Sequence, residues 1–347
     1  MSGIDILTNG GCTLKMERKL ASIQTINNIR PIEGADKIER ASVFGWETVI
    51  KKGEFKEGDK CVFFEIDSIL PSQCDWTNFM SARKFRVKTV KIKGQLSQGL
   101  ALPVLNVFDN DSFDVGEDVT TRLGITKYKP PLLSLAQQKE CAGVFPSEIP
   151  KTDEIRIQSA PKLLEEIENV PLVATVKLDG MSGTFYKKDG TLHVCSRNWE
   201  LKEGINAYWR VAKKYNLINI LPEGIAVQGE VCGPGIQKNR LNLKEEDLFV
   251  FNVYDISIRH FLDNEDARKW CNERCLVSVP VAYMWEQGKE TFSLDELLNL
   301  AEGIYEGTKN KREGIVIRPL KERYSSMLRG RLSFKVISNS FLLKEED

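Results

Sequence analysis

The chain has no net charge, because its 49 lysines and arginines balance its 49 aspartates and glutamates. This balance excludes a field over the whole molecule that would attract a polyanion, so any nucleic-acid site must come from local clusters of cations. The chain also lacks a run of about 18 apolar residues, which a membrane-spanning helix would need. Its N-terminal residues contain no basic segment that leads into an apolar one. We therefore expect an intracellular protein, in the cytoplasm or nucleus, without a membrane span.

Patterns typical of metal centres and disulfides are also missing. The 347 residues include only two histidines, and the eight cysteines are scattered without a CxxC pair. Cys271 and Cys275 lie at helical i, i+4 spacing, but no second pair of ligands accompanies them, so a structural zinc site is not expected. We interpret the cysteines as reduced thiols. The length predicts two domains, each with its own core, and we expect a monomer.

The first part of the chain, residues 16–125, has the pattern of a small β-barrel. Short apolar segments alternate with turns, and no long helical pattern separates them. The strands predicted by this pattern are residues 20–26, 38–43, 46–50, 60–66 and 85–92. Strands of this length and spacing are typical of a closed or partly open barrel. The turns at 31–38 and 93–100 resemble those of tRNA-binding oligonucleotide-binding (OB) barrels.

Residues 83–93 of this barrel carry six cations and no acid. Cations along a strand can neutralise phosphates, each with a salt-dependent contribution to binding. They can equally be the solvated lysines that protect an edge strand from aggregation. The candidates for nucleic-acid contact are Arg86, Lys88, Lys91 and Lys93. Trp46 and Phe55 could stack on bases, but for large aromatics burial in the core is the stronger expectation.

We expect a linker at residues 126–144, between the barrel and a second domain over 145–347. Pro130 and Pro131 stiffen this stretch and prevent a helix from continuing through it. Early in the second domain, Thr152 is placed to cap a helix through Ile157, with two acids in its first turn. Downstream, predicted strands and helices mix, as in an α+β domain.

The rest of the second domain is organised around the segment from Thr175 to Gly180. An apolar strand over 171–176 would place Lys177 at the mouth of a pocket, where desolvation lowers the pKa of an amine and makes it a nucleophile. Asp179 would point to the same side as Lys177, and Gly180 lets the backbone bend close to a ligand. Alone, Lys-x-Asp-Gly is also typical of a solvated turn with a surface ion pair.

Four further segments follow in order, at 195–198, 228–235, 313–318 and 333–336. They read CSRN, QGEVCGPG, EGIVIR and SFKV. With the lysine segment, this series resembles the motifs of covalent nucleotidyltransferases, and most closely those of RNA ligases. The resemblance implies an α+β fold in which an OB-type β-barrel precedes a nucleotidyltransferase domain, ATP-grasp-like, of antiparallel sheets with helices.

The resemblance also implies a role for each matched residue. Lys177 would be the catalytic nucleophile, and ATP with Mg²⁺ or Mn²⁺ would be the cofactors. The implied nucleotide-binding residues are Val176, Asp179, Arg197, Glu230, Phe251 and Lys335, and the implied metal-binding residues are Asp179, Glu230 and Glu313. The family often has a second lysine two positions after the last one, where this chain has Ile337. Arg318 or Lys311 could replace its charge.

The function implied is an ATP-dependent RNA ligase that seals 3′-hydroxyl and 5′-phosphate breaks, at nicks in duplexes, through a lysyl-AMP intermediate at Lys177. DNA ligases and mRNA capping enzymes share the lysine motifs but carry their OB barrel after the last motif. Here only 12 residues follow Lys335 and a barrel precedes the motifs, which favours RNA as the partner. Two alternatives stay open: a GTP-using, capping-like guanylyltransferase, and an inactive RNA-binding protein of the same fold.

Overall fold

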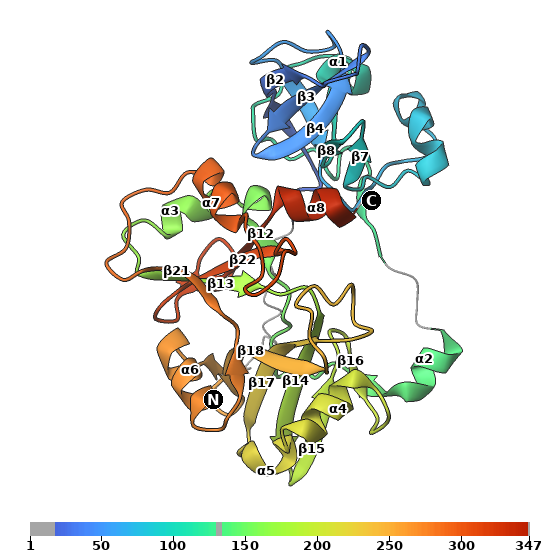
Figure 1. Cartoon of the computed structure of the whole chain (residues 1–347). Helices are drawn as coiled ribbons and strands as arrows, with labels where there is room; N and C mark the ends of the chain where they lie inside the picture. Colours follow the sequence, from blue (N-terminus) through green and yellow to red (C-terminus); the bar gives the residue numbers. More distant parts are fainter. Residues whose placement is uncertain (1–17, 130–133, 346–347) are drawn as a thin grey trace, which may run out of the picture.

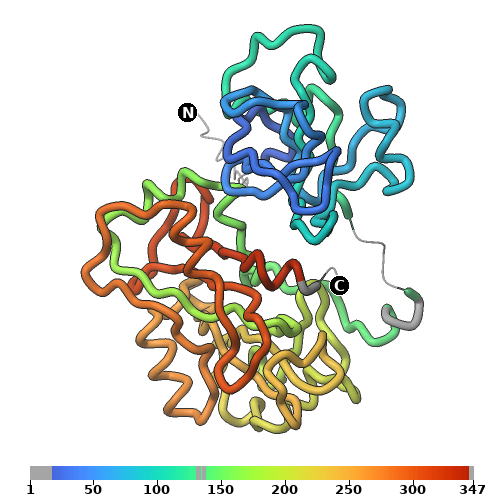
Figure 2. Tube along the Cα trace, turned by 45° about the horizontal axis from the view of Figure 1, so that its top comes forward, coloured from blue at the N-terminus to red at the C-terminus, as the bar shows by residue number. Residues whose placement is uncertain are grey.

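The computed structural model describes residues 18–129 and 134–345. Figure 1 shows a small body of N-terminal strands at the top and a larger body below it. Helix α8 (Asn339–Glu345) lies between the two bodies in this view and in the turned view of Figure 2. The described part of the chain contains no helix that is long and apolar enough to cross a membrane. The prediction of an α+β protein with an N-terminal β-barrel is confirmed.

The N-terminal body combines two three-stranded antiparallel sheets, with strand orders β1-β5-β9 and β2-β3-β4. Their bounds are β1 (Ala21–Thr25), β2 (Asn27–Pro31), β3 (Ile38–Val43), β4 (Trp46–Lys51), β5 (Lys60–Phe64) and β9 (Leu100–Pro103). A short helix, α1 (Val104–Val107), follows β9. Trp46 and Phe55 are only 1% and 6% exposed. They are therefore core residues and not surfaces for stacking bases.

The segment between β5 and β9 differs from the prediction. It contains β6 (Ser68–Ile69), the 3₁₀ helix η1 (Asp75–Arg83), and the hairpin of β7 (Val90–Ile92) and β8 (Gln95–Ser97). The expected strand over 85–92 is wrong, because only its last three residues are a strand. Lys84 and Phe85 adopt positive φ angles of 52° and 58°, and this left-handed backbone ends η1 and interrupts any extended chain.

The larger body contains two main sheets. The eight-stranded sheet has the order β11-β16-β15-β14-β17-β18-β19, with β20 also paired to β18, and the five-stranded sheet has the order β12-β25-β22-β13-β21. The strands of the first sheet are β11 (Cys141–Val144), β14 (Met181–Lys188), β15 (Thr191–Cys195), β16 (Trp199–Leu201), β17 (Ile225–Cys232), β18 (Asp247–Asp255), β19 (His260–Phe261) and β20 (Val277–Ser278). Those of the second are β12 (Ile155–Arg156), β13 (Leu172–Lys177), β21 (Val281–Trp285), β22 (Gly314–Pro319) and β25 (Phe334–Ile337).

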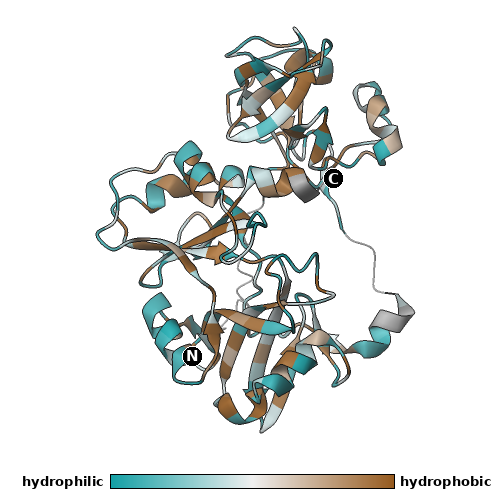
Figure 3. Cartoon of the chain, viewed as in Figure 1, coloured by the Kyte–Doolittle hydropathy of each residue, from teal (hydrophilic) through white to brown (hydrophobic). Residues whose placement is uncertain are grey.

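Helices cover each sheet on its apolar side, where Figure 3 shows brown strands facing them. Residues of α4, α5 and α6 share one core cluster with the eight-stranded sheet, and residues of α3 and α7 share another with the five-stranded sheet. Their bounds are α3 (Leu163–Glu166), α4 (Ala207–Lys214), α5 (Leu217–Ile220), α6 (Asn264–Asn272) and α7 (Leu294–Ala301). Caps set two of the starts: Asn206 accepts the N–H of Trp209, and Ser293 accepts the N–H of Glu296.

The remaining elements are short. The stretch at 126–144 contains β10 (Thr126–Lys127), which pairs with β6 of the barrel, α2 (Leu135–Glu140), and β11, which pairs with β16 of the larger body. Further along lie the 3₁₀ helix η2 (Ile157–Ser159) and the small hairpin of β23 (Tyr324–Ser325) and β24 (Gly330–Arg331). The chain thus crosses from one body to the other through paired strands at both ends of this stretch.

The barrel and the larger body are in direct contact. The Ser159 hydroxyl donates a 2.8 Å hydrogen bond to Glu65 of the barrel. The guanidinium of Arg156 lies 5.6 Å from the ring centre of Trp46. Gly45, in the turn between β3 and β4, faces α7 so closely that a Cβ there would lie 2.3 Å from Cδ2 of Leu294. The turn can pack on α7 only because residue 45 has no side chain.

The Gly45→Ala variant therefore tests this packing. Gly45 and Gly53 share nearly the same φ, 73° and 74°, but a Cβ at Gly53 would meet nothing within 4 Å. We expect Gly53→Ala to lose about 1 kcal/mol from its left-handed backbone alone, and Gly45→Ala to lose a further ~1–3 kcal/mol by overpacking against Leu294. Denaturant titration of both variants measures the difference. Equal losses would contradict the packing of the turn on α7.

Candidate active site

A cavity of about 430 Å³ lies where the two sheets of the larger body meet. Strands β13, β22 and β25 of one sheet and β14, β17 and β18 of the other contribute to its lining. Residues from all five sequence segments line it: Lys177 and Asp179, Arg197, Glu230, Glu313 and Arg318, and Lys335. The structure thus brings together residues that lie up to 158 positions apart, as the numbers of Lys177 and Lys335 show.

Lys177 is the last residue of β13, an interior strand of the five-stranded sheet between β22 and β21. Its backbone pairs with Gly314 of β22, so Glu313 lies beside it, and its Nζ is 2.6 Å from Oε2 of Glu313. Gly314 is required for this register, because its φ is 151° and a Cβ there would lie 2.1 Å from the Val336 carbonyl oxygen. The close pairing of β22 with β25 thereby fixes the contact between the lysine and the glutamate.

The charge state of Lys177 differs from the sequence prediction. Burial by itself would lower the pKa of this amine, but the carboxylates of Glu313, Glu230 and Asp179 outweigh it, and the net pKa is raised. The expectation that burial makes Lys177 a neutral amine is therefore wrong for the protein alone. Three nearby acids hold it as an ammonium ion, and it can act as a nucleophile only when their field is weakened.

The three acids lie in different elements of the fold, and their carboxylates repel one another. Burial, opposed by Lys177 but reinforced by Glu313 and Asp179, raises the pKa of Glu230 to about 7. Burial and the Glu313 carboxylate likewise raise the pKa of Asp179. Repelling carboxylates around one point fit a divalent cation, and oxygen ligands suit Mg²⁺ or Mn²⁺. Within residues 18–129 and 134–345, no group of three or more acidic, His or Cys side chains is arranged to hold a metal ion directly.

Asp179 lies in the turn after β13, and a neighbouring arginine holds its carboxylate in place. Nε of Arg240 donates a 3.0 Å hydrogen bond to its Oδ2, and the Arg240 guanidinium lies 4.7 Å from the ring centre of Phe341 in α8. The turn also needs Gly180, since a Cβ there would lie 2.5 Å from the Val231 carbonyl oxygen. The C-terminal helix thus supports the arginine that orients Asp179.

Lys335, on β25, supplies a cation to the cavity. Burial, Lys177 and Arg156 together lower its pKa to about 8. Ile337, where related sequences often have a second lysine, is 3% exposed and belongs to the core. Of the two residues proposed to replace that charge, Arg318 lines the cavity. Its guanidinium is bound to Glu154 at 3.0 Å, so its charge is already compensated.

Comparison with known proteins identifies the family. An OB-fold domain model matches residues 20–104, and an RNA ligase model matches residues 170–337. None of the curated proteins matches the chain. A solved structure of a Naegleria gruberi RNA ligase variant with ATP and Mn is 38% identical, with a TM-score of 0.76, and the match covers 95% of this chain and 100% of that chain. The chain belongs to the RNA ligase family.

Two other structures of the Naegleria gruberi RNA ligase are equally similar. One is a variant with AMP and Mn, and the other contains PPi. Each is 38% identical, has a TM-score of 0.75, and matches 95% of this chain and 100% of the other. The nucleotide and metal belong to those proteins, and the similarity extends over both bodies of the present ligase.

The predicted base and sugar contacts of the ligase also lie at the cavity. Val176 and Phe251 line it, and Phe251 lies on β18, with the Arg318 guanidinium 5.9 Å from its ring centre. Arg197 lies at the exposed edge, where it forms an ion pair with Asp153. The flat ring on one wall and the arginine at the rim fit a stacked base and a ribose.

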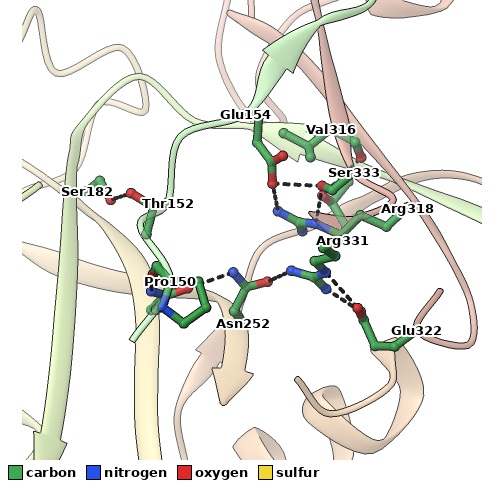
Figure 4. Close-up of polar contacts among 12 residues, drawn as sticks. Pro150, Thr152, Glu154, Ser182, Asn252, Val316, Arg318, Glu322, Arg331 and Ser333 are labelled. Atoms are coloured by element: carbon green, nitrogen blue, oxygen red, sulfur yellow. Dashed lines mark hydrogen bonds and ion pairs between the residues drawn. The ribbon is translucent and has the colours of Figure 1, made fainter. Parts of the chain in front are cut away.

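The sequence prediction missed the segment before η2. Residues expected as a helix from Thr152 are extended, because β12 pairs with β25 in parallel and leads the chain along the cavity. Thr152 and Ser182 share a 2.5 Å hydrogen bond, and Glu154 accepts hydrogen bonds from Ser333 at 2.7 Å and from Arg318 (Figure 4). A capping residue with acids after it is a local signal, and it could not reveal this long-range pairing.

A second chain of polar contacts in Figure 4 connects the eight-stranded sheet to the hairpin of β23 and β24. Gln228 donates a 2.7 Å hydrogen bond to the Pro150 carbonyl and accepts one of 2.8 Å from Asn252. Arg331 donates to Asn252 at 2.7 Å and forms an ion pair with Glu322. Gln228 and Asn252 are both buried, so these hydrogen bonds satisfy polar groups that water does not reach.

Tyr305 is another residue of the site that no sequence pattern indicated. Its hydroxyl donates a 3.1 Å hydrogen bond to the Lys177 carbonyl oxygen and accepts one of 3.1 Å from the Glu313 N–H. The side chain is 3% exposed. One phenol therefore fixes the backbones that carry the amine and its closest acid.

The predicted nucleic-acid cations of the barrel do not form one surface strand. Arg86 forms a 2.5 Å ion pair with Asp67 and stacks on Tyr128, with 3.4 Å between its Cζ and the ring centre. Lys88 is exposed in the loop before β7, Lys91 lies within β7, and Lys93 follows it in the turn to β8. The cations therefore differ in environment, and Asp67 and Tyr128 already engage the guanidinium of Arg86.

The buried pair behind the cavity leads to a prediction on stability. Burial would raise the pKa of Glu154, but Arg318 and Arg331 outweigh it and lower the pKa, so Glu154 stays ionised. We expect Glu154→Gln to cost about 3 kcal/mol of unfolding free energy, because it leaves the Arg318 charge buried and unbalanced. The matched control is Glu148→Gln, which breaks an exposed pair with Lys188 and should cost less than about 1 kcal/mol. Denaturant unfolding measures both, and similar losses would contradict the role of the buried pair.

Proposed function

We propose that this protein is an ATP-dependent RNA ligase that joins 3′-hydroxyl and 5′-phosphate ends, at nicks in duplexes, through a lysyl-AMP intermediate at Lys177. The observation that carries the proposal is the convergence of Lys177, three carboxylates and Lys335 on one cavity, each at the position that the family motifs predict. The Naegleria gruberi structures with ATP, AMP and PPi support the choice of nucleotide and of product.

In the first step, Nζ of Lys177 attacks the α-phosphorus of ATP. A nitrogen–phosphorus bond forms, the bond to the bridging oxygen breaks, and pyrophosphate leaves with that oxygen. Lys177 must first lose a proton, and Glu313, 2.6 Å from Nζ, is placed to accept it. Lys335 balances negative charge on the α-phosphate during the attack.

Asp179, Glu230 and Glu313 would hold Mg²⁺ or Mn²⁺. When bound, this ion would cancel part of the negative field that raises the pKa of Lys177, and it would neutralise phosphate charge. The orientation of Asp179 by Arg240 and the backbone positions set by Tyr305 prepare the acids for this task.

The rest of the cavity positions the nucleotide and the RNA end. Phe251 would stack on adenine beside Val176, and Arg197 would contact the ribose and the reacting strand. In the second step the 5′-phosphate of the RNA attacks the lysyl-AMP phosphorus and releases Lys177. In the third step the 3′-hydroxyl attacks the 5′-phosphorus, a phosphodiester forms, and AMP leaves. Arg86, Lys88, Lys91 and Lys93 are the proposed RNA contacts on the barrel.

The decisive experiment is self-labelling. Incubation with ATP labelled at the α-phosphate and Mn²⁺ should leave label on the denatured chain, and Lys177→Met should abolish it because no amine remains at that position. Lys188→Met, which removes an exposed lysine on β14, is the control and should keep the label. Label from GTP in place of ATP would indicate a capping-like enzyme, and no label would indicate an RNA-binding protein. A nicked RNA duplex then tests sealing.

The pH dependence of ATP binding provides a second test. With a pKa of about 8, set by burial, Lys177 and Arg156 against the opposing Glu313 and Asp153, Lys335 is charged below pH 8 and neutral above it. We expect the KM for ATP in self-labelling to rise roughly tenfold between pH 7 and pH 9, as the charged fraction of Lys335 falls from about nine-tenths to about one-tenth. Lys335→Arg should flatten this rise, because a guanidinium stays charged. An identical rise in the variant would contradict the assignment.

A further inference from the structure

The barrel contains a second cavity, of about 740 Å³, which the proposed chemistry does not use. Its apolar surface comes from β4, β7 and β9, including Val49, Val90 and Leu100. Helix η1 adds Trp76 and Phe79. In Figure 1, the cyan segment that contains η1 projects from the same side of the barrel as β7. The groove is therefore a surface of the barrel itself, separate from the cavity around Lys177.

Its two aromatic residues differ in their packing and exposure. Trp76 is half-buried and stacks on Phe64 of β5, with 5.6 Å between the ring centres, so its position is fixed by the core. Phe79 is 59% exposed, although its neighbours Thr77 and Met80 in η1 are buried. An exposed phenylalanine beside an apolar groove is a common mark of a binding surface.

The charge around the groove selects the class of ligand. Lys51, Arg83 and Lys88 line it and are exposed, against the acids Glu54 and Asp75. Glu54 is already paired with Lys51, at 3.7 Å. In a chain with no net charge, this local excess favours an anionic partner.

We propose that this groove binds an unpaired nucleotide of the RNA substrate. Its base would stack on Phe79 beside Trp76, and its phosphates would contact Arg83 and Lys88. Flat rings interleaved with cations are the combination by which proteins bind single-stranded nucleic acid, because stacking holds the base and the cations hold the backbone. The inference rests on the proposed function, and it adds a single-stranded stretch outside the duplex to the substrate that the ligase recognises.

The roles of the predicted cations are revised by the same geometry. Arg86 does not line the groove, and Asp67 and Tyr128 already engage its guanidinium. Arg83 and Lys88 line it, and the first of these was not among the predicted RNA contacts. The turn formed by Lys84 and Phe85 reverses the chain between η1 and the loop before β7. It thereby brings Arg83 and Lys88 to the same groove.

The test uses a nicked RNA duplex with a single-stranded tail that contains the fluorescent base 2-aminopurine. Binding to the full chain should quench this fluorescence through stacking. Phe79→Ala should abolish the quenching and weaken binding of the tailed duplex about tenfold. Phe79→Tyr, which keeps a flat ring, should restore both. The matched control is Phe44→Ala, since Phe44 is an exposed phenylalanine of the same barrel that does not line the groove, and this variant should bind like the parent.

A salt titration tests the cations. Lys88→Ala should reduce the slope of log affinity against log salt by about one, as expected for a lost phosphate contact. Unchanged quenching and affinity in Phe79→Ala would overturn the proposal, and so would displacement of the RNA tail by an acidic peptide without loss of duplex binding. Self-labelling with ATP is measured in parallel. Labelling without quenching would refute only the groove, whereas the absence of labelling would refute the proposed function.

Discussion

The contact between Lys177 and Glu313, with two further carboxylates around it, is the interaction on which the site depends. It places an ammonium ion among acids, and burial, reinforced by the repulsion of Glu313 and Asp179, raises the pKa of Glu230 to about 7. Partly buried like charges of this kind destabilise a fold unless rigid elements hold them. Two sheets supply that rigidity: β13 and β22 fix Lys177 and Glu313 in register, and β17 of the other sheet brings Glu230. The cavity is therefore a consequence of how the two sheets meet.

Residues outside the cavity lining hold these charged groups in place. Tyr305 bonds to the backbones of both partners, Arg240 orients Asp179, and α8 supports Arg240 through Phe341. The hydrogen bonds of Tyr305 and Arg240 are made to backbone groups and to a single carboxylate oxygen, so they restrict direction as well as distance. Pre-organisation of this kind matters for catalysis because charges already held in place need no rearrangement when the reaction begins.

The sequence predicted the parts of the site that are marked by local patterns. The strand before Lys177 and the order of the five segments depend on neighbouring residues, and both are present. The helix from Thr152 was wrong because parallel pairing of β12 with β25 overrides the local capping signal. The lowered pKa of Lys177 was wrong because burial was considered without the charges that long-range pairing brings. Tyr305 carries no local signal at all.

Ile337 stands where related sequences often have a second lysine after Lys335. Ile337 lies two residues after Lys335, so both side chains are on the same face of β25, and an apolar residue there continues the core. The cross-strand register places Arg156 of β12 opposite Lys335, and its charge helps to lower the pKa of that lysine. A second cation thus lies near Lys335, but it comes from the adjacent strand. Because a neighbouring strand is invisible in a motif read along the chain, this cation could not be identified from the sequence.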